Sequence, residues 1–308
     1  MAYLRQTKPS HLGLILKIAE VGQLQKAASS MAMSQPAASR ILADIEKSVG
    51  APLFKRGPKG MEETLLGAAV VRHARVILSE LDGLDKDVQR LKNGLAGEVR
   101  IGSVTGPAVA ILMPALEAVR AHSPHIDVTI EVGPSTDLVR GLDEGRFDFI
   151  FARMPATQDS RDFLIHPAQE EIVRLIIRDS HPLVGRTQVQ LQELHAFDWV
   201  IQERGSPIRL AVEEAFHSAG EPTPTRVINS SSLLIVVALL ERSDVIAPLA
   251  NEVADLLSGP HLGAHLTTID LAQKITVSPY FIIRNRFKEL PQVAKDFFDE
   301  VVSRVRAP

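Results

Sequence analysis

QLQKAASSMAMSQPAASRILADIEKS, residues 23–48, is the stretch that decides the fold, because it predicts two helices joined by a short turn. Ser34 is a good N-cap, and Pro36 falls in the first turn of the second helix, where its missing N–H costs no hydrogen bond. The apolar residues of this helix recur at helical spacing and define a buried face: Ala38, Ile41, Leu42, Ile45 and Val49. Gln35 and Arg40 stand at its leading end, and both residue types bind base edges in the major groove. The pattern predicts a DNA-reading helix; the open alternative is a helical hairpin with a solvated face.

The residues on either side extend the same small domain. Upstream, another amphipathic helix is predicted by Leu12, Ile15, Leu16 and Ala19. Downstream, APLFKRGPKG, residues 51–60, surrounds its basic side chains with turn residues, as in a wing that lies over phosphates: Lys55, Arg56 and Lys59. Nine Lys and Arg against three Asp and Glu give residues 1–60 a net charge of +6, whereas residues 95–308 carry −8. A basic head on an acidic body indicates nucleic acid bound at one end.

The next segment carries an apolar seam with alternating spacings of four and three residues: Val70, Ala74, Ile77, Leu81, Leu84, Val88 and Leu91. This spacing is the a/d repeat of a coiled coil. A helix over residues 67–92 would be about 39 Å long at 1.5 Å per residue, too long for a small domain to cover its stripe. We therefore expect this helix to dimerise; the alternative is packing against the protein's own body. Asn93 and Gly94 end the helix.

Residues 95–308 alternate short apolar strands with amphipathic helices, which predicts an α/β fold with mostly parallel sheet. Strands are expected at 98–103, 127–132, 148–152, 172–177, 198–202, 226–229, 245–247 and 275–283. Helices are expected at 107–121, 136–144, 207–219, 231–241, 252–257 and 292–305. Because roughly 210 residues is large for one sheet, we expect two α/β lobes.

Small polar residues follow several of these strands, at the places where ligands bind in α/β folds. The junctions that contain them comprise Ser103, Val104, Thr105, Gly106, Ser135, Thr136, Gln202, Ser206, Pro207, Ser230, Ser231 and Ser232. Their register with the strands favours a small-molecule pocket, although Ser and Thr at such places also serve as plain N-caps. Arg153 and Arg209 either add charge for an anionic ligand or form surface ion pairs.

Several classes of chemistry are not expected. The chain has no cysteine, so it offers no disulfide, thiol nucleophile or cysteine-based metal site. The histidine pairs at 122/125 and 261/265 do not share a helical face, and neither is expected to bind a metal. No signal sequence is recognised, and the longest apolar run, residues 233–240, is too short to cross a bilayer. The chain has no Walker, GxGxxG, G-x-S-x-G or HExxH motif, so we expect that it has no cofactor and is not an enzyme. The lack of cysteine and of a recognised signal sequence leads us to expect a cytoplasmic protein.

AASSMAMSQPAASRILADIEKSVGAPLFKRGPKGMEETLLG, residues 27–67, resembles the winged helix-turn-helix of LysR-type transcriptional regulators. The likeness is dense over roughly the first 65 residues, and the layout of the whole chain agrees with it. It implies that Arg56 is the wing arginine and that five residues occupy recognition-helix positions: Ser34, Gln35, Pro36, Ser39 and Arg40. One departure is Gln23 and Gln25, which stand where the family often has Ser or Thr.

The resemblance also implies an architecture and an effector. It implies antiparallel pairing of the linker helices, a dimer of dimers that bends DNA, and a periplasmic-binding-protein-like regulatory region. The chain would cross between the lobes near residue 168 and return near 272, and the cleft would be lined by Ser103, Thr105, Ser135, Gln202 and Ser231. The stretch VRIGSVTGPAVAILMPAL, residues 99–116, is similar to the branch of the galactose-binding-protein regulator. That branch implies a sugar or sugar acid as effector, with an aromatic or aliphatic carboxylate as the rival.

We therefore interpret the chain as an effector-responsive transcription factor. A winged helix-turn-helix is expected at 1–66, a linker and dimerisation helix at 67–94 and an effector-binding domain at 95–308. Within that domain, lobe 1 is expected at about 95–168 and 272–308, and lobe 2 at about 169–271. The expected partners are double-stranded promoter DNA, a small-molecule effector, further copies of the chain in a homodimer or homotetramer, and RNA polymerase if it activates. A solute-binding protein with the same two-lobed body would need an export signal and would have no use for the basic head. An enzyme on this fold would need a positioned acid–base pair in the cleft, and the sequence shows no motif for one.

Overall fold

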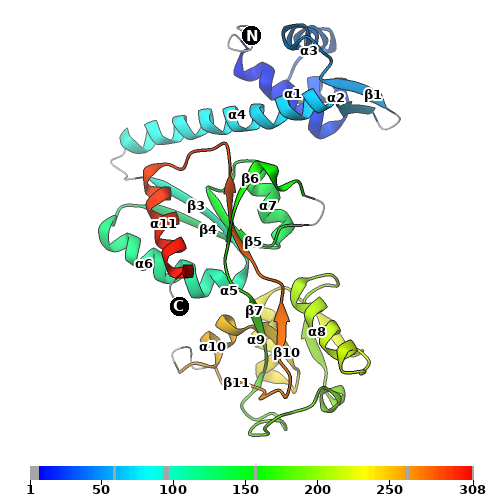
Figure 1. Cartoon of the computed structure of the whole chain (residues 1–308), viewed down its shortest axis with the longest axis vertical. Helices are drawn as coiled ribbons and strands as arrows, with labels where there is room; N and C mark the ends of the chain where they lie inside the picture. Colours follow the sequence, from blue (N-terminus) through cyan, green and yellow to red (C-terminus); the bar gives the residue numbers. More distant parts are fainter. Residues whose placement is uncertain are drawn as a thin grey trace. The chain divides into compact units, whose positions relative to one another are not determined.

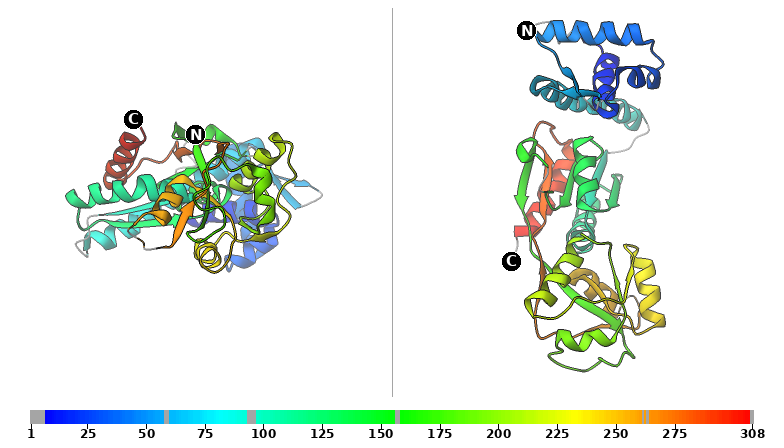
Figure 2. Two further views of the ribbon diagram at one scale, coloured as in Figure 1. Left: turned by 90° about the horizontal axis from the view of Figure 1, so that it is seen from below. Right: turned by 90° about the vertical axis from the view of Figure 1, so that its right-hand side faces the viewer.

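The protein is described from a computed structural model that covers residues 7–57, 60–92, 97–155, 158–260, 262 and 264–306. The chain forms two compact units (Figures 1 and 2). The first consists of Met1–Gly97 with Arg140–Arg146 and Arg286–Glu289, and the second contains the remaining residues. Each unit has its own hydrophobic core or cores.

The N-terminal unit begins with three helices and a hairpin: α1 (Pro9–Val21), α2 (Leu24–Ser30), α3 (Gln35–Val49), β1 (Phe54–Gly57) and β2 (Gly60–Glu63). The strands pair antiparallel, with Phe54 opposite Glu63. The helices enclose a core that includes Leu14, Ile15, Ile18, Ala27, Ala28, Ala38, Leu42 and Ile45. The winged helix-turn-helix expected from the sequence is therefore confirmed.

The hairpin is fixed to the helices by close backbone contacts. Glu46 of α3 accepts a hydrogen bond from the N–H of Leu53 at 2.7 Å, which holds the turn before β1. Met61 N–H donates to the carbonyl of Gly22 at 2.7 Å. Gly60 has φ +121°, and a Cβ there would lie 2.4 Å from the Gly22 oxygen, so this position requires glycine.

Helix α4 (Leu65–Lys92) carries the apolar seam, and the seam divides into two parts. At its start, Val70 packs against the winged-helix core together with Val71, and Ala74 is buried. Further along, the seam side chains are exposed: Ile77 (46%), Leu81 (39%), Leu84 (57%) and Val88 (40%). The side chain of Leu91 lies outside the described residues. Only the first turns of the seam are therefore covered by the protein's own winged helix.

Lobe 1 of the second unit is a five-stranded sheet with the strand order β4-β3-β5-β13-β6. Its strands are β3 (Glu98–Ser103), β4 (Asp127–Val132), β5 (Phe149–Ala152), β6 (Phe163–Pro167) and β13 (Phe281–Asn285). Its helices are α5 (Thr105–Pro107), the π-helical η2 (Ala108–Leu112), α6 (Met113–His122), α7 (Ser135–Asp143), the short η3 (Ser160–Asp162) and α11 (Gln292–Arg306). α6 and α11 cover one face and α7 the other (Figure 1).

Lobe 2 is built around the long strand β7 (Glu171–Arg178), which pairs antiparallel with three strands: β10 (Ala247–Ala250), β11 (Leu266–Thr268) and β12 (Ile275–Val277). A parallel pair, β8 (Trp199–Ile201) and β9 (Val227–Asn229), is joined to it by a bridge between Trp199 and Ile246. The helices of this lobe are η4 (Leu191–Ala196), α8 (Pro207–Ser218), α9 (Leu233–Arg242) and α10 (Asn251–Ser258).

Two expectations about the sheets are wrong. The single strand expected at 275–283 is two strands, because β12 pairs with β7 in lobe 2 and β13 pairs with β5 and β6 in lobe 1. The chain therefore returns to lobe 1 through residues 278–280. The sheets are also mixed rather than mostly parallel, since every ladder of β7 and β13 is antiparallel. The two-lobed α/β class itself is confirmed.

The start of α4 gives a stability prediction. A Cβ at Gly67 would lie 1.9 Å from the carbonyl oxygen of Leu53, whereas a Cβ at Gly83, in the same helix, would meet nothing within 4 Å. Gly67→Ala is expected to destabilise the winged helix by about 1–3 kcal/mol, because backbone must move. Gly83→Ala is expected to stabilise the protein by about 1 kcal/mol, because alanine favours helix. Calorimetric unfolding of both variants measures their transition temperatures. Equal transition temperatures for the two variants would contradict the close contact at Gly67.

Candidate functional site

The leading end of α3 presents polar side chains to solvent. Ser34 caps the helix by accepting from Ala37 N–H at 3.4 Å, and Pro36 occupies the first turn. The side chains that the sequence marks for DNA contact are exposed: Ser34, Gln35, Pro36, Ser39 and Arg40. Ala38, Leu42 and Ile45 face the core instead. Burial of one face therefore fixes the helix while its other face stays available to a ligand.

The wing adds positive charge beside this helix. Lys55 and Arg56 lie exposed on β1, and Lys55 Nζ is 3.7 Å from a carboxylate oxygen of Glu62 across the hairpin. This exposed ion pair is weak and leaves Lys55 available to a phosphate. Lys59 lies outside the described residues. α3 and the wing thus provide hydrogen-bonding and cationic groups, the combination needed for base edges and phosphates.

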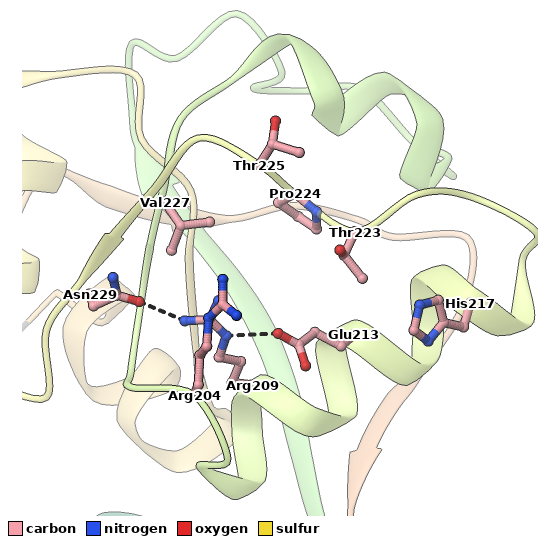
Figure 3. Close-up of a pocket in the computed structure, with 9 residues that line it drawn as sticks. All are labelled: Arg204, Arg209, Glu213, His217, Thr223, Pro224, Thr225, Val227 and Asn229. Atoms are coloured by element: carbon pink, nitrogen blue, oxygen red, sulfur yellow. Dashed lines mark hydrogen bonds and ion pairs between the residues drawn. The ribbon is translucent and has the colours of Figure 1, made fainter.

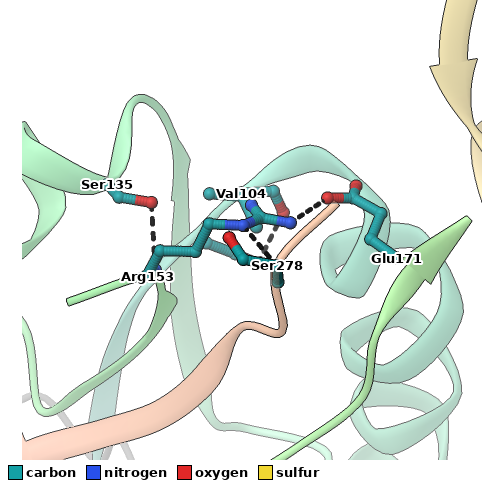
Figure 4. A network of polar contacts seen from close by, with 6 residues as sticks. Val104, Ser135, Arg153, Glu171 and Ser278 are labelled. Atoms are coloured by element: carbon teal, nitrogen blue, oxygen red, sulfur yellow. Dashed lines mark hydrogen bonds and ion pairs between the residues drawn. The ribbon is translucent and has the colours of Figure 1, made fainter. Parts of the chain in front are cut away.

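A second polar site lies where the chain crosses between the lobes (Figure 4). Arg153, directly after β5 of lobe 1, forms a buried ion pair with Glu171 at the start of β7 in lobe 2. Its Nε donates to the carbonyl of Ser278 at 2.8 Å, and its backbone N–H donates to Ser135 Oγ at 3.0 Å. One arginine therefore links lobe 1 to both crossing segments. Of the alternatives for Arg153, an ion pair is therefore present, but it is largely buried rather than on the surface, since the side chain is only 12% exposed.

A second carboxyl lies close to Glu171. A Cβ on Gly106 would be 2.9 Å from Glu171 Oε1 and 3.3 Å from Glu252 Oε2, so both carboxyls converge on the backbone of Gly106. Glu252 Oε2 is buried and has no hydrogen-bond partner among the described residues. Burial raises the pKa of Glu252, and the charge of Glu171 raises it further. Burial, with Glu252 and Glu171, also raises the pKa of Tyr280.

The remaining strand-end residues of lobe 1 lie around this ion pair. Ser103 is fully buried and its hydroxyl donates to the carbonyl of Val104 at 2.8 Å. Thr105 and Thr136 are exposed, whereas Gly106 is buried against lobe 2. Of the expected groups, Gly106 and Arg153 therefore contact lobe 2, and Ser135 is joined to Arg153 within lobe 1.

The strand-end residues of lobe 2 form a separate group around Arg209 in α8. This arginine is 7% exposed and donates to the Gln202 carbonyl at 3.3 Å, to Asn229 Oδ1 at 2.6 Å and to Glu213 at 2.7 Å. Ser206 and Pro207 begin α8, and the Ser206 hydroxyl is buried without a partner in the described residues. Ser230 accepts from Ser232 N–H at 3.3 Å, Ser231 is exposed, and Ser232 caps α9.

A cavity of about 500 Å³ opens beside Arg209, lined by Arg204, Arg209, Glu213, His217, Thr223, Pro224, Thr225, Val227 and Asn229 (Figure 3). Of these residues, the sequence had marked Arg209 alone. Glu171, Glu252 and Tyr280 were also missed, because their position depends on contacts between strands far apart in sequence. A glutamate that opens an apolar strand, as in EIVRLIIR at 171–178, was the available signal.

The described residues include no group of three or more His, Asp or Glu side chains placed to hold a metal ion. No helix among them is long and apolar enough to cross a membrane.

Comparison with known proteins agrees with this arrangement. Residues 9–68 match the bacterial regulatory helix-turn-helix family of LysR type, and residues 92–306 match the LysR substrate binding domain. The chain is 38% identical over 252 residues to the HTH-type transcriptional regulator GbpR of Rhizobium radiobacter, covering 81% of this chain and 83% of that protein. It is 30% identical to the regulator GalR of Pseudomonas putida, covering 80% of this chain and 61% of that protein. Both names support the branch expected from the sequence.

Solved structures of two LysR-type regulators have the same fold. A full-length OxyR variant from Pseudomonas aeruginosa aligns with a TM-score of 0.61 at 21% identity, over 97% of each chain. Full-length CbnR in complex with its target DNA aligns with a TM-score of 0.55 at 22% identity, over 96% of this chain and 99% of that chain. The sequence matches and the fold together show that the chain belongs to the LysR family of transcriptional regulators.

Proposed function

We propose that this regulator acts as a dimer that reads promoter DNA with α3 and the wing and responds to a small molecule bound at the lobe junction. The observation that carries the proposal is α3, which packs Ala38, Leu42 and Ile45 inward and exposes Gln35, Ser39 and Arg40. In the proposed division, residues 1–66 bind DNA, 67–94 link and dimerise, and 95–308 respond to the effector. Lobe 2 extends to about residue 277, since β12 belongs to its sheet.

Dimerisation is proposed to use the exposed part of the α4 seam. Four large apolar side chains at heptad spacing stay 39–57% exposed, and a row of this kind is costly to leave in water. Val70 packs against the winged-helix core and Ala74 is buried, and both belong to the proposed seam, which Leu91 completes. A dimer would present two recognition helices to successive major grooves, and pairing of dimers into a homotetramer would bend the site.

The effector is proposed to be a sugar or a sugar derivative. The names GbpR and GalR suggest such ligands for those relatives. The lobe junction agrees, because Arg153 is already neutralised by Glu171, and a carboxylate effector would have to displace that buried partner. A neutral polyol would instead use the hydroxyls of Thr105 and Ser135. The rival remains an aromatic or aliphatic carboxylate bound by Arg153.

We further propose that the protein is cytoplasmic, has no catalytic activity, and contacts RNA polymerase if it activates transcription. The relatives named above are transcriptional regulators, which supports a binding role for the two-lobed region. An enzyme would convert its ligand to a product, and a solute-binding protein would not bind duplex DNA. A regulator is therefore distinguished from both by salt-dependent binding to duplex DNA without conversion of the ligand.

The proposed role of α3 is tested by Arg40→Ala. We expect the preference for the protein's own DNA site over a shuffled duplex to fall by about 1–3 kcal/mol, because a base contact is lost. Lys47→Ala, at the other end of the same helix, carries the same charge change and should leave that preference unchanged. Anisotropy titrations at two salt concentrations measure both variants. Full site preference in Arg40→Ala would show that this residue reads no base.

The proposed dimer is tested by Leu84→Lys in the exposed seam. A lysine there would place a charge in the apolar interface, and we expect the dimer to dissociate at least about tenfold more readily. Asp82→Lys introduces the same side chain two residues away, outside the seam, and should keep the dimer. Sedimentation of both variants measures the mass of the assembly in solution. An unchanged mass for Leu84→Lys would place the dimer interface elsewhere.

The lobe junction predicts a dependence of stability on pH. A carboxyl whose pKa is higher in the folded state stabilises the fold at low pH, and this contribution is lost as pH rises through the folded pKa. Glu252 is such a group, facing Glu171, Asp255 and Tyr280. Glu252→Gln should therefore raise the melting temperature by a few degrees at pH 8, on the scale of about 2–4 °C per kcal/mol, and by less at pH 4.5. Glu241→Gln, exposed on α9, is the control. An equal effect at both pH values would contradict the account.

A further inference from the structure

The cavity beside α8 has not been used by the function proposed so far. All nine residues that line it lie between Arg204 and Asn229, within lobe 2. Apart from Arg209, which the sequence offers as a charge for an anionic ligand, none belongs to the strand-end residues expected to bind the effector. Its walls are one face of α8, through Arg209, Glu213 and His217, and the segment from Thr223 through β9 (Figure 3). A ligand there would need no contact with lobe 1.

Arg209 is a prepared binding group in this cavity. A guanidinium has five N–H donors. Nε donates to Glu213, and Nη1 donates to both the Gln202 carbonyl and Asn229 Oδ1. Nη2 has no acceptor among the described residues, although the residue is only 7% exposed. Three bonds thus hold the group rigid, and two donors stay available to a ligand in the cavity.

Arg204 supplies a second cation. It is exposed at the edge of the cavity, and no acidic side chain in the described part of the chain pairs with it. Two guanidinium groups on one cavity favour a carboxylate or phosphate, which both can bind through paired hydrogen bonds.

Glu213 narrows the choice of ligand. Its carboxylate pairs with Arg209 and also lines the cavity, so it repels simple anions and accepts hydrogen bonds. Thr223 and Thr225 add hydroxyls that donate or accept. A ligand that satisfies all of these groups has one anionic end and several hydroxyls. A cavity of about 500 Å³ accommodates a molecule the size of a hexose.

We propose that lobe 2 carries a second ligand site, distinct from the lobe junction, that binds a small polyhydroxylated anion such as a sugar acid. Arg204 and Arg209 bind the carboxylate, and Glu213 and the threonines bind the hydroxyls. Because one lobe contains the whole site, its occupancy does not depend on how the lobes are arranged.

The single tryptophan of the chain gives a direct signal for this site. Trp199 is fully buried, pairs in register with Val227 of β9, and packs against Phe216 of α8 at 5.8 Å between ring centroids. Both neighbouring elements line the cavity. Titration of the full-length protein at constant ionic strength would compare gluconate with sorbitol, which lacks the carboxylate, and with acetate, which lacks the hydroxyls. We expect gluconate to change the emission saturably at millimolar concentration, with the other two at least about tenfold weaker.

Substitutions show which residues bind the gluconate that changes the Trp199 emission. Arg204→Ala should weaken gluconate binding at least about tenfold, whereas Arg242→Ala, which changes another exposed arginine, on α9, should not. Glu213→Gln should strengthen acetate relative to gluconate, because the competing carboxylate is removed. Absence of any gluconate response overturns the proposal, as does equal binding by the Arg204 and Arg242 variants. Loss of the response in Thr105→Val with retention in Arg204→Ala would place gluconate at the lobe junction and also overturn it; the function proposed above would survive that result.

Discussion

The ion pair between Arg153 and Glu171 is the interaction on which the regulatory region depends. It joins the end of β5 in lobe 1 to the start of β7 in lobe 2, and both side chains are nearly buried. Loss of either partner would leave a charge uncompensated in a poorly hydrated place. The same arginine binds the second crossing segment at Ser278, so the two chain segments that connect the lobes are tied to one side chain. Gly106 completes the contact, because only a residue without a side chain admits the two carboxyls so close to the backbone.

This arrangement would make the lobe junction, the proposed effector site, sensitive to a ligand. The junction already contains one satisfied ion pair and one buried carboxyl oxygen without a partner in the described residues. A bound molecule that changes either of these shifts the balance between arrangements of the lobes, in proportion to its difference in affinity for them. The pocket beside α8 differs in kind, because its residues all belong to one lobe. We propose a neutral ligand at the junction because Arg153 is already paired there with Glu171. We propose an anion in lobe 2 because Arg204 and Arg209 supply positive charge to its cavity.

Local patterns in the sequence predicted much of the structure. The strands at 98–103 and 127–132 and the starts of α3 and α8 agree to within about a residue, since alternation, caps and proline act over a few neighbours. Strands β6 and β11 were missed, and 275–283 was predicted as one strand, because nothing local distinguishes Val277 from Phe281. Their partner residues lie about 90 residues away for β11 and more than a hundred residues away for β6, β12 and β13. The same reason hid Glu171 and Glu252, whose contacts come from chain crossings. Residues at strand ends, such as Ser135 and Arg153, could be predicted because the topology of an α/β fold places them.

We propose, as the central claim, that the two α3 helices of a dimer, one from each subunit, read the DNA sequence. The most direct test is selection of duplexes from a random pool by the full-length protein, followed by sequencing of the bound fraction. The account predicts enrichment of two related half-sites whose centres lie about 10–10.5 base pairs, or one helical turn, apart. A bound fraction with the same sequence distribution as the starting pool would contradict it, because the exposed face of α3 would then contribute charge without reading bases.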